Sequence, residues 1–147
     1  MLRYVLFLLD TQAFALPLAG VEQVIRAVEI TPLPQAPPTL VGVIDVHGTV
    51  LPVVNIRQQL GLPDQAVQLD DQLVIAQLNE RWVAFVVTEV RGIIEPSIRS
   101  LVAAKELFPG VTHLEGGVKT EDGLIFIHSL DELFAHSAEG WLADIRQ

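Results

Sequence analysis

The chain has 147 residues and a formal net charge of −9, and 50% of its residues are hydrophobic. This composition indicates about one globular domain and excludes a disordered chain. The acidic charge disfavours nucleic acid and anionic membrane surfaces as partners. There is no cysteine, which excludes disulfides, thiolate metal sites and a cysteine nucleophile and is typical of a reducing compartment. We therefore expect a cytoplasmic protein without a targeting segment or direct membrane insertion.

Short apolar runs separated by turn signals predict an all-β barrel or sandwich with short helices. The first hairpin pairs Tyr4–Leu9 with Ala13–Leu18. The segment Val21–Glu29 predicts a short helical turn that passes into a strand. The proline-rich segment Thr31–Thr39 is stiff and extended, and it acts either as a tether that sets the angle between strands or as an ordinary connector.

The next hairpin pairs Val41–Val46 with Thr49–Val54 across His47 and Gly48, because Gly48 can adopt a positive φ. The segment Asn55–Gly61 predicts a short helix, with Asn55 as its N-cap and Gly61 at its end. A polar linker, Pro63–Asp71, follows.

A similar order of elements follows the linker. The predicted strands are Leu73–Leu78, Trp82–Val87, Val90–Ile94, Val111–Val118 and Leu124–His128, and a capping box predicts a helix over Ser129–Phe134. Ser97–Thr112 is either a long loop or a loop with a helical turn around Val102–Leu107. The tail, 136–147, has apolar residues spaced for one helix face, and it either folds back on a barrel or serves as a docking segment.

The two halves resemble each other, which suggests two related β units within a single domain, 1–147, divided roughly at 62–72. Periodicity alone leaves this duplication open, because a sequence rich in Val and Leu also produces chance matches.

The motifs of enzymes are missing from this sequence. The four histidines lack metal-ligand spacing, and no nucleophile elbow or phosphate-binding glycine loop is present. Acidic pairs such as Asp70-Asp71 and Glu121-Asp122 fall in linkers and turns. We therefore predict no enzymatic activity, no catalytic residue, no metal and no cofactor, and a protein that acts by binding. An enzyme of an unrecognised class would need polar groups that converge in a cleft.

Three groups of residues resemble the CheW family. They are Val21–Arg26 with Ile30–Pro34; the segment Val41–Arg57, with its Gly-Val-Ile-Asp-Val-His-Gly and Leu-Pro-Val-Val-Asn-Ile-Arg runs; and the closing Gly116-Gly117-Val and Gly123-Leu-Ile-Phe-Ile. The resemblance covers about Arg3 to Phe134. It implies two intertwined five-stranded SH3-like β-barrels that share a hydrophobic core. It also implies a non-catalytic adaptor that couples the cytoplasmic tip of a chemoreceptor to the regulatory domain of a CheA-type histidine kinase.

The resemblance places a receptor-coupling site at Val21, Gln23 and His47. The family usually has an acid at the position of Gln23 and an arginine at that of His47, which together form a charge-assisted pair. Gln23 and His47 can form only a weaker hydrogen bond. We therefore expect an intact scaffold with a divergent receptor-coupling site, and surface drift at both positions is the alternative.

The kinase-binding face is expected on the strands that carry Val43, Ile44 and Thr49, about half of whose residues must point into the core. The rival function is a β-barrel that binds a small hydrophobic ligand, which requires a pocket of several hundred Å³. Small barrels have interiors that side chains fill, which argues against this rival.

Overall fold

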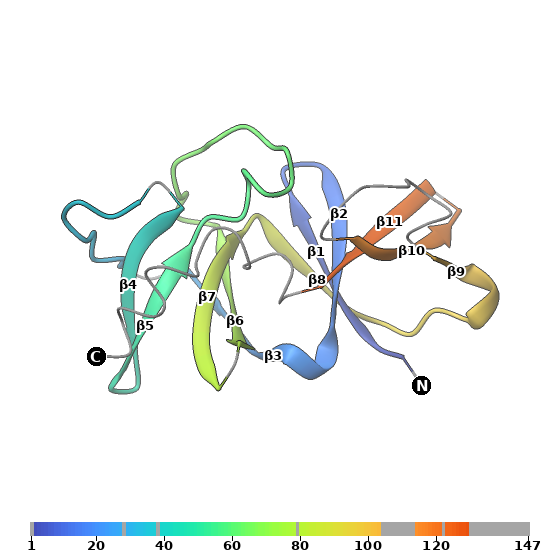
Figure 1. The fold of residues 1–147 in the computed structure, drawn as a ribbon, viewed down its shortest axis with the longest axis horizontal. Coiled ribbons are helices and arrows are strands. Elements are labelled where there is room, and N and C mark those ends of the chain that lie inside the picture. Colours follow the sequence, from blue (N-terminus) through green and yellow to red (C-terminus); the bar gives the residue numbers. More distant parts are fainter. Residues whose placement is uncertain are drawn as a thin grey trace.

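The structure is a computed structural model that describes residues 2–27, 29–37, 39–78, 80–103, 114–121 and 123–129 (Figure 1). Regular structure in these ranges is almost entirely β, with two short 3₁₀ turns, η1 (Leu18–Gly20) and η2 (Ile98–Ser100). The strands are β1 (Tyr4–Leu9), β2 (Gln12–Pro17), β3 (Val21–Arg26), β4 (Leu40–Val46), β5 (Thr49–Val54), β6 (Gln72–Leu78), β7 (Arg81–Val87), β8 (Glu89–Ile94), β9 (Leu101–Ala103), β10 (Leu114–Thr120) and β11 (Gly123–His128).

The strands form two sheets that lie side by side in Figure 1. The first sheet has the order β8-β1-β2-β11-β10-β9, and the second has the order β3-β6-β7-β5-β4. The chain begins in the first sheet, crosses through η1 to the second, and returns to the first at Thr88. This path interlocks the two units, so the intertwined all-β fold predicted from the sequence is confirmed.

The two sheets do not divide at 62–72, where the sequence places the boundary. That segment joins β5 to β6 within the second sheet. The physical reason is the long-range parallel pairing of β5 with β7, in which Val53 lies opposite Ala84. A matching parallel pair, β2 with β11, joins distant parts of the chain in the first sheet.

A close crossing beyond β3 closes the second sheet into a small barrel. Thr31 and Val43 exchange two backbone hydrogen bonds, both 2.9 Å long, which connect the segment after β3 to the edge of β4. Gly42 allows this approach, because a Cβ at that position would overlap the Thr31 carbonyl and would lie 2.8 Å from Ile30 Cγ2. The glycine is therefore required by the crossing chain.

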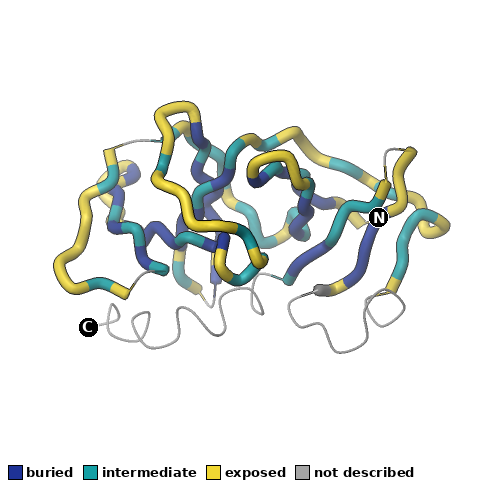
Figure 2. Tube along the Cα trace, turned by 90° about the horizontal axis from the view of Figure 1, so that it is seen from above, coloured by how far each residue is buried: buried dark blue, intermediate teal, exposed yellow. Residues whose placement is uncertain are grey.

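Side chains pack into three apolar clusters, and buried stretches run through both halves of the molecule (Figure 2). The shared core between the sheets consists of Phe7, Leu9, Phe14, Leu16, Val54, Ile56, Val74, Ala76, Leu78, Val83, Phe85 and Val87. The interior of the second barrel consists of Ile44, Val46, Leu51, Val53, Leu73, Ile75 and Ala84, and that of the first includes Tyr4, Ala15, Val118 and Ile127. Successive side chains of a strand point to opposite faces of the sheet, so one strand contributes side chains to two clusters.

Aromatic rings join the two sheets within the shared core. Phe7 of β1 stacks on Phe14 of β2, with ring centroids 5.8 Å apart, and it meets Phe85 of β7 edge-on at 5.9 Å. These geometries are the favoured ones for aromatic pairs. The expectation of a shared hydrophobic core is therefore confirmed.

Two predicted local elements differ from the structure. Residues 57–61 form a hydrogen-bonded turn instead of a helix, although Asn55 Oδ1 accepts from Arg57 N–H at 3.0 Å and Gly61 has φ +74° as predicted. The segment is too short for a helix, because the chain turns back at once and Leu62 N–H bonds Arg57 O. The short helical turn predicted at the start of Val21–Glu29 is not formed there, because β3 begins at Val21; a 3₁₀ turn lies before it, at Leu18–Gly20.

Several predicted features lie outside the described residues. They are the body of the Ser129–Phe134 helix, the tail 136–147 and most of the alternative helical turn at Val102–Leu107. The described part of Ser97–Thr112 holds η2 and β9. Across the ranges that the structure describes, no helix has the length and apolar character needed to cross a membrane.

Candidate functional site

The first two candidate coupling residues lie at the start of β3, at one edge of the second sheet. Val21 pairs with Ala76 and Gln23 with Ile75, and the register shifts between them, so an irregularity separates their side chains. Val21 packs partly against the shared core, and Gln23 is half-buried. Both side chains are therefore partly accessible next to the seam, the line where the two sheets meet around the shared core.

His47 lies at the tip of the β4–β5 hairpin. Its φ is +51° and that of Gly48 is +89°, which is the pattern of a two-residue type I′ turn. Asp45 Oδ1 accepts a 2.8 Å hydrogen bond from Gly48 N–H and stabilises the turn. His47 is exposed, so its ring is presented to solvent on a well-defined turn.

The structure brings these residues to one end of the second barrel without joining them. The β5–β7 register places the β4–β5 turn and the β6–β7 turn at the same end, and Val21 starts β3 there. No hydrogen bond joins Gln23 to His47 in the described ranges. The weaker hydrogen bond that the sequence allowed between them is not formed.

The residues of the expected kinase face divide between core and surface. Val43 is half-buried and Thr49 is exposed, whereas Ile44 is only 2% exposed and packs inside the second barrel. Successive residues of a strand point to opposite faces, so Val43 and Ile44 cannot share a surface. The edge of β4 at Val43 is also already paired with Thr31.

Sequence reasoning missed two exposed apolar side chains near this face. Val50 on β5 is 63% exposed and Trp82 on β7 is 38% exposed. The two strands are parallel neighbours, and both residues lie near the turn end of the barrel. The position of Trp82 next to a predicted turn was an available signal for an exposed aromatic residue.

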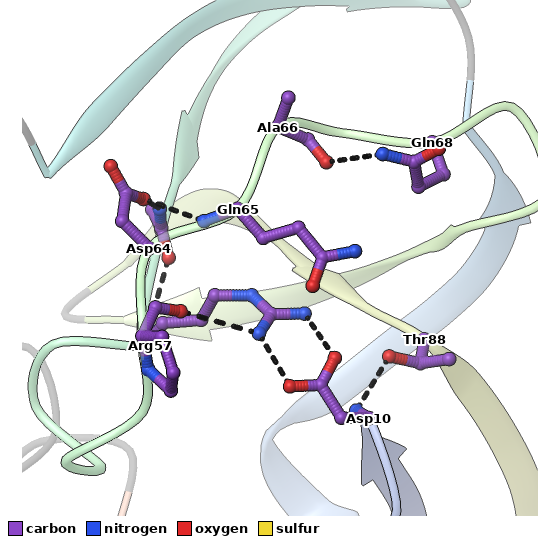
Figure 3. A network of polar contacts seen from close by, with 9 residues as sticks. Asp10, Arg57, Asp64, Gln65, Ala66, Gln68 and Thr88 are labelled. Atoms are coloured by element: carbon purple, nitrogen blue, oxygen red, sulfur yellow. Dashed lines mark hydrogen bonds and ion pairs between the residues drawn. The ribbon is translucent and has the colours of Figure 1, made fainter.

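A polar cluster at the other end of the seam was also not foreseen (Figure 3). Arg57 Nη1 donates to Asp10 Oδ2 and Arg57 Nη2 donates to Asp10 Oδ1, each at 2.9 Å, in a bidentate ion pair. Asp10 lies in the turn between β1 and β2 of the first sheet, and Arg57 follows β5 of the second. The pair therefore links the two sheets.

The neighbours of this pair hold both partners in position. Arg57 Nη1 also reaches Pro63 O at 3.4 Å, and Asp10 N–H donates to Thr88 Oγ1 at 2.8 Å. The Arg57 side chain is 10% exposed and that of Asp10 is 41% exposed. The hydrogen bond and charge of Arg57 lower the pKa of Asp10, and Asp10, with Asp71 and Asp64, raises the pKa of Arg57 despite its burial.

Three grooves lined by described residues bring together no set of catalytic side chains. One of about 720 Å³ opens on the first sheet and is lined mainly by Leu6, Leu8, Ala13, Ile94, Leu124, Ile125 and Phe126. Its charged lining residue, Arg91, is paired with Glu89. Among the described residues, no group of three or more His, Asp or Glu side chains could hold a metal ion.

These features define a class of protein: a β domain of two interlocked sheets that share a hydrophobic core. The family model for the CheW-like domain matches residues 3–138. That match covers nearly the whole chain, and the protein belongs to the CheW-like domain family.

Individual relatives agree with this assignment. The chain is 28% identical to a chemotaxis protein CheW of Thermotoga maritima over 127 residues, which are 86% of this chain and 83% of the relative. It is 26% identical to a chemotaxis protein CheW of Rhizobium meliloti over 130 residues, with 87% and 84% covered. The crystal structure of the scaffolding protein TtCheW from Thermoanaerobacter tengcongensis has the same fold, with a TM-score of 0.80, 24% identity and 93% and 94% of the chains covered.

Proposed function

We propose that this protein is a non-catalytic adaptor that couples a chemoreceptor to a CheA-type histidine kinase in a chemosensory array. The observation that carries the proposal is the CheW-like family match over residues 3–138. The names of its relatives, chemotaxis proteins and a scaffolding protein, agree with this role. The work of such an adaptor is recognition, which requires rigid surfaces.

The proposed receptor-coupling site is the turn end of the second barrel, with Val21, Gln23 and His47. Val21 and Gln23 lie next to the seam between the sheets, and His47 projects from a rigid hairpin turn. Without the charge pair that is usual in the family, this site would bind its receptor tip through apolar contact and neutral hydrogen bonds. A divergent receptor in the same kind of array fits these residues.

The proposed kinase-binding face is the outer β4–β5 surface around Val43 and Val50, which lie on the same side of the sheet by the β4–β5 register. Thr49 and Trp82 alternate to the other side of the sheet and border this face only at the turn end. An apolar centre with a polar rim is the usual anatomy of a protein interface, and exposed Trp is a frequent energetic anchor. Ile44 supports this face from inside the barrel.

Co-purification from the native cell tests the proposal. Tagged full-length protein should recover a histidine kinase and a chemoreceptor. Val50→Glu should sharply reduce kinase recovery, because a charge replaces an apolar residue that is 63% exposed on the proposed face. The matched control is Ile93→Glu on β8 of the first sheet, where Ile93 is 59% exposed. If neither variant lowers kinase recovery, the β4–β5 surface is not the kinase-binding face. If the tagged protein recovers neither partner, the adaptor role is rejected.

The groove on the first sheet supports a second candidate function, the binding of a small apolar ligand. Its volume of about 720 Å³ falls within the range of ligand sites. Against it, the interior of the second barrel is filled by buried side chains. Native mass spectrometry of the purified protein with and without extraction by organic solvent would show a bound ligand if this candidate is correct.

A further inference from the structure

Inter-sheet polar bonds occur at one end of the seam, next to the β1–β2 turn. The Asp10–Arg57 ion pair is one of them, and a 2.6 Å bond from Val90 N–H to Gln72 Oε1 is another. Val90 belongs to β8 of the first sheet and Gln72 begins β6 of the second. Val90 lies opposite Phe7, near the same end of β1 as Asp10. The chain also crosses back to the first sheet here, at Thr88, whose N–H bonds Leu8 O.

The opposite end of the seam is the crossing through η1. There the chain passes from Pro17, at the end of β2, to Val21, at the start of β3. Val21 N–H donates to Leu18 O and completes the short 3₁₀ turn. The shared core, with Phe7, Phe14 and Phe85, lies between the two ends. The seam therefore has polar contacts at one end, the shared apolar core at its centre, and the chain crossing through η1 at the other end.

Arg57 is suited to fix the polar end. Its planar guanidinium grips both oxygens of one carboxylate, which restrains orientation as well as distance. The Arg57 side chain is buried while the Asp10 carboxylate is 41% exposed, so solvent screens this contact on the Asp10 side. Each partner is separately fastened to its own neighbours, Asp10 to Thr88 and Arg57 to Pro63. A rotation of one sheet against the other would pull the ion pair apart.

We propose that the Asp10–Arg57 pair is a latch that sets the angle between the two sheets and so fixes the position of Val21 at the far end of the seam. The two sheets pivot about the shared core, and the pivot displaces the chain crossing at η1, which carries Val21. Arg57 is thus a positioning residue. This inference concerns the fold itself and does not depend on which partner the protein binds.

Amide hydrogen exchange on the full chain tests the latch. In Arg57→Gln and in Asp10→Asn, the amides of Asp10, Thr88 and Val21 should exchange about tenfold faster, the ratio expected for loss of a charge-assisted hydrogen bond. The interior amides of Val74 and Val118 should keep their wild-type rates. The double variant should resemble either single variant, because each removes the same interaction. Acceleration at Asp10 and Thr88 without any change at Val21 would overturn the far-end effect.

The matched control is Arg3→Gln, which breaks the Arg3–Glu95 ion pair beside β1 and β8 of the first sheet. It should leave the exchange of Thr88 and Val21 unchanged. The absence of cysteine also allows paired spin labels at Lys119→Cys and Thr49→Cys, one in each sheet and both exposed. The latch variants should broaden the distance distribution between these labels, and Arg3→Gln should not. Uniformly faster exchange, or unchanged distance distributions in both latch variants, would overturn the proposal.

Discussion

At the scale of single residues, the Asp10–Arg57 pair predicts a specific dependence on acid. The pKa of Asp10 is lower in the folded chain than its ordinary value of 3.8. The pair therefore contributes stability fully above that value, and the contribution is lost as the pH falls through the lowered pKa. In urea unfolding, wild type should be more stable than Asp10→Asn at pH 7, and the difference should shrink as the pH falls below about 4. A difference that stays constant down to pH 2 would contradict this assignment.

Gln23 and His47 give a second prediction at this scale. If their neutrality matches a divergent receptor, the double variant Gln23→Glu with His47→Arg should change how much receptor the protein captures in a pulldown, because it restores the charges usual in the family. Kinase capture should stay the same. Equal receptor capture by wild type and variant would mean that the two positions are neutral surface changes.

Residue roles were less predictable from the sequence than strand positions. Arg57 lies in a segment that resembles the family, but its partner Asp10 lies 47 positions away and has the local pattern of a turn residue. The alternation of Val43, Ile44 and Thr49 is predicted from the sequence, but the sequence alone does not show that Ile44 is the residue that points into the barrel. A contact between distant residues requires the sheet pairing, which local pattern does not contain.

At the scale of elements, the crossing of 30–31 over β4 makes Gly42 difficult to replace. Gly42→Ala should cost about 1–3 kcal/mol of folding free energy, because the new methyl group overlaps backbone atoms at Thr31. The variant should also lose exchange protection at Thr31 and Val43. Gly48→Ala is the comparison: it has nothing within 4 Å but φ +89°, and should cost about 1 kcal/mol from backbone conformation alone. Equal protection at Thr31 and Val43 in Gly42→Ala and wild type would refute the steric explanation.

Hairpins were the elements that sequence predicted best. Tyr4–Leu9 and Thr49–Val54 have the expected bounds, because apolar runs end at clear turn residues. The Asn55–Gly61 segment had correct end signals but too few residues between them for a helix. The boundary at 62–72 was misplaced for a different reason, since a polar linker within one sheet looks the same in sequence as a linker between two.

At the scale of the whole molecule, the shared core predicts that the two sheets unfold together. Phe85→Ala should cost about 3–5 kcal/mol, as for other large-to-small changes at fully buried aromatic positions. Near-ultraviolet and far-ultraviolet circular dichroism should still report one transition. The control Ile93→Ala, at an exposed position, should stay within about 0.5 kcal/mol of wild type. Two separate transitions in Phe85→Ala would show that the sheets are independent units.

The proposed adaptor role is to bridge a receptor and a kinase without catalytic activity of its own. Its most direct test is reconstitution of the co-purified histidine kinase with receptor-containing membrane vesicles, with and without this protein, followed by measurement of kinase autophosphorylation. Kinase activity should become dependent on the receptor only when the protein is present, and Val50→Glu should weaken that dependence. If the kinase depends on the receptor to the same extent with and without the protein, the adaptor role is contradicted.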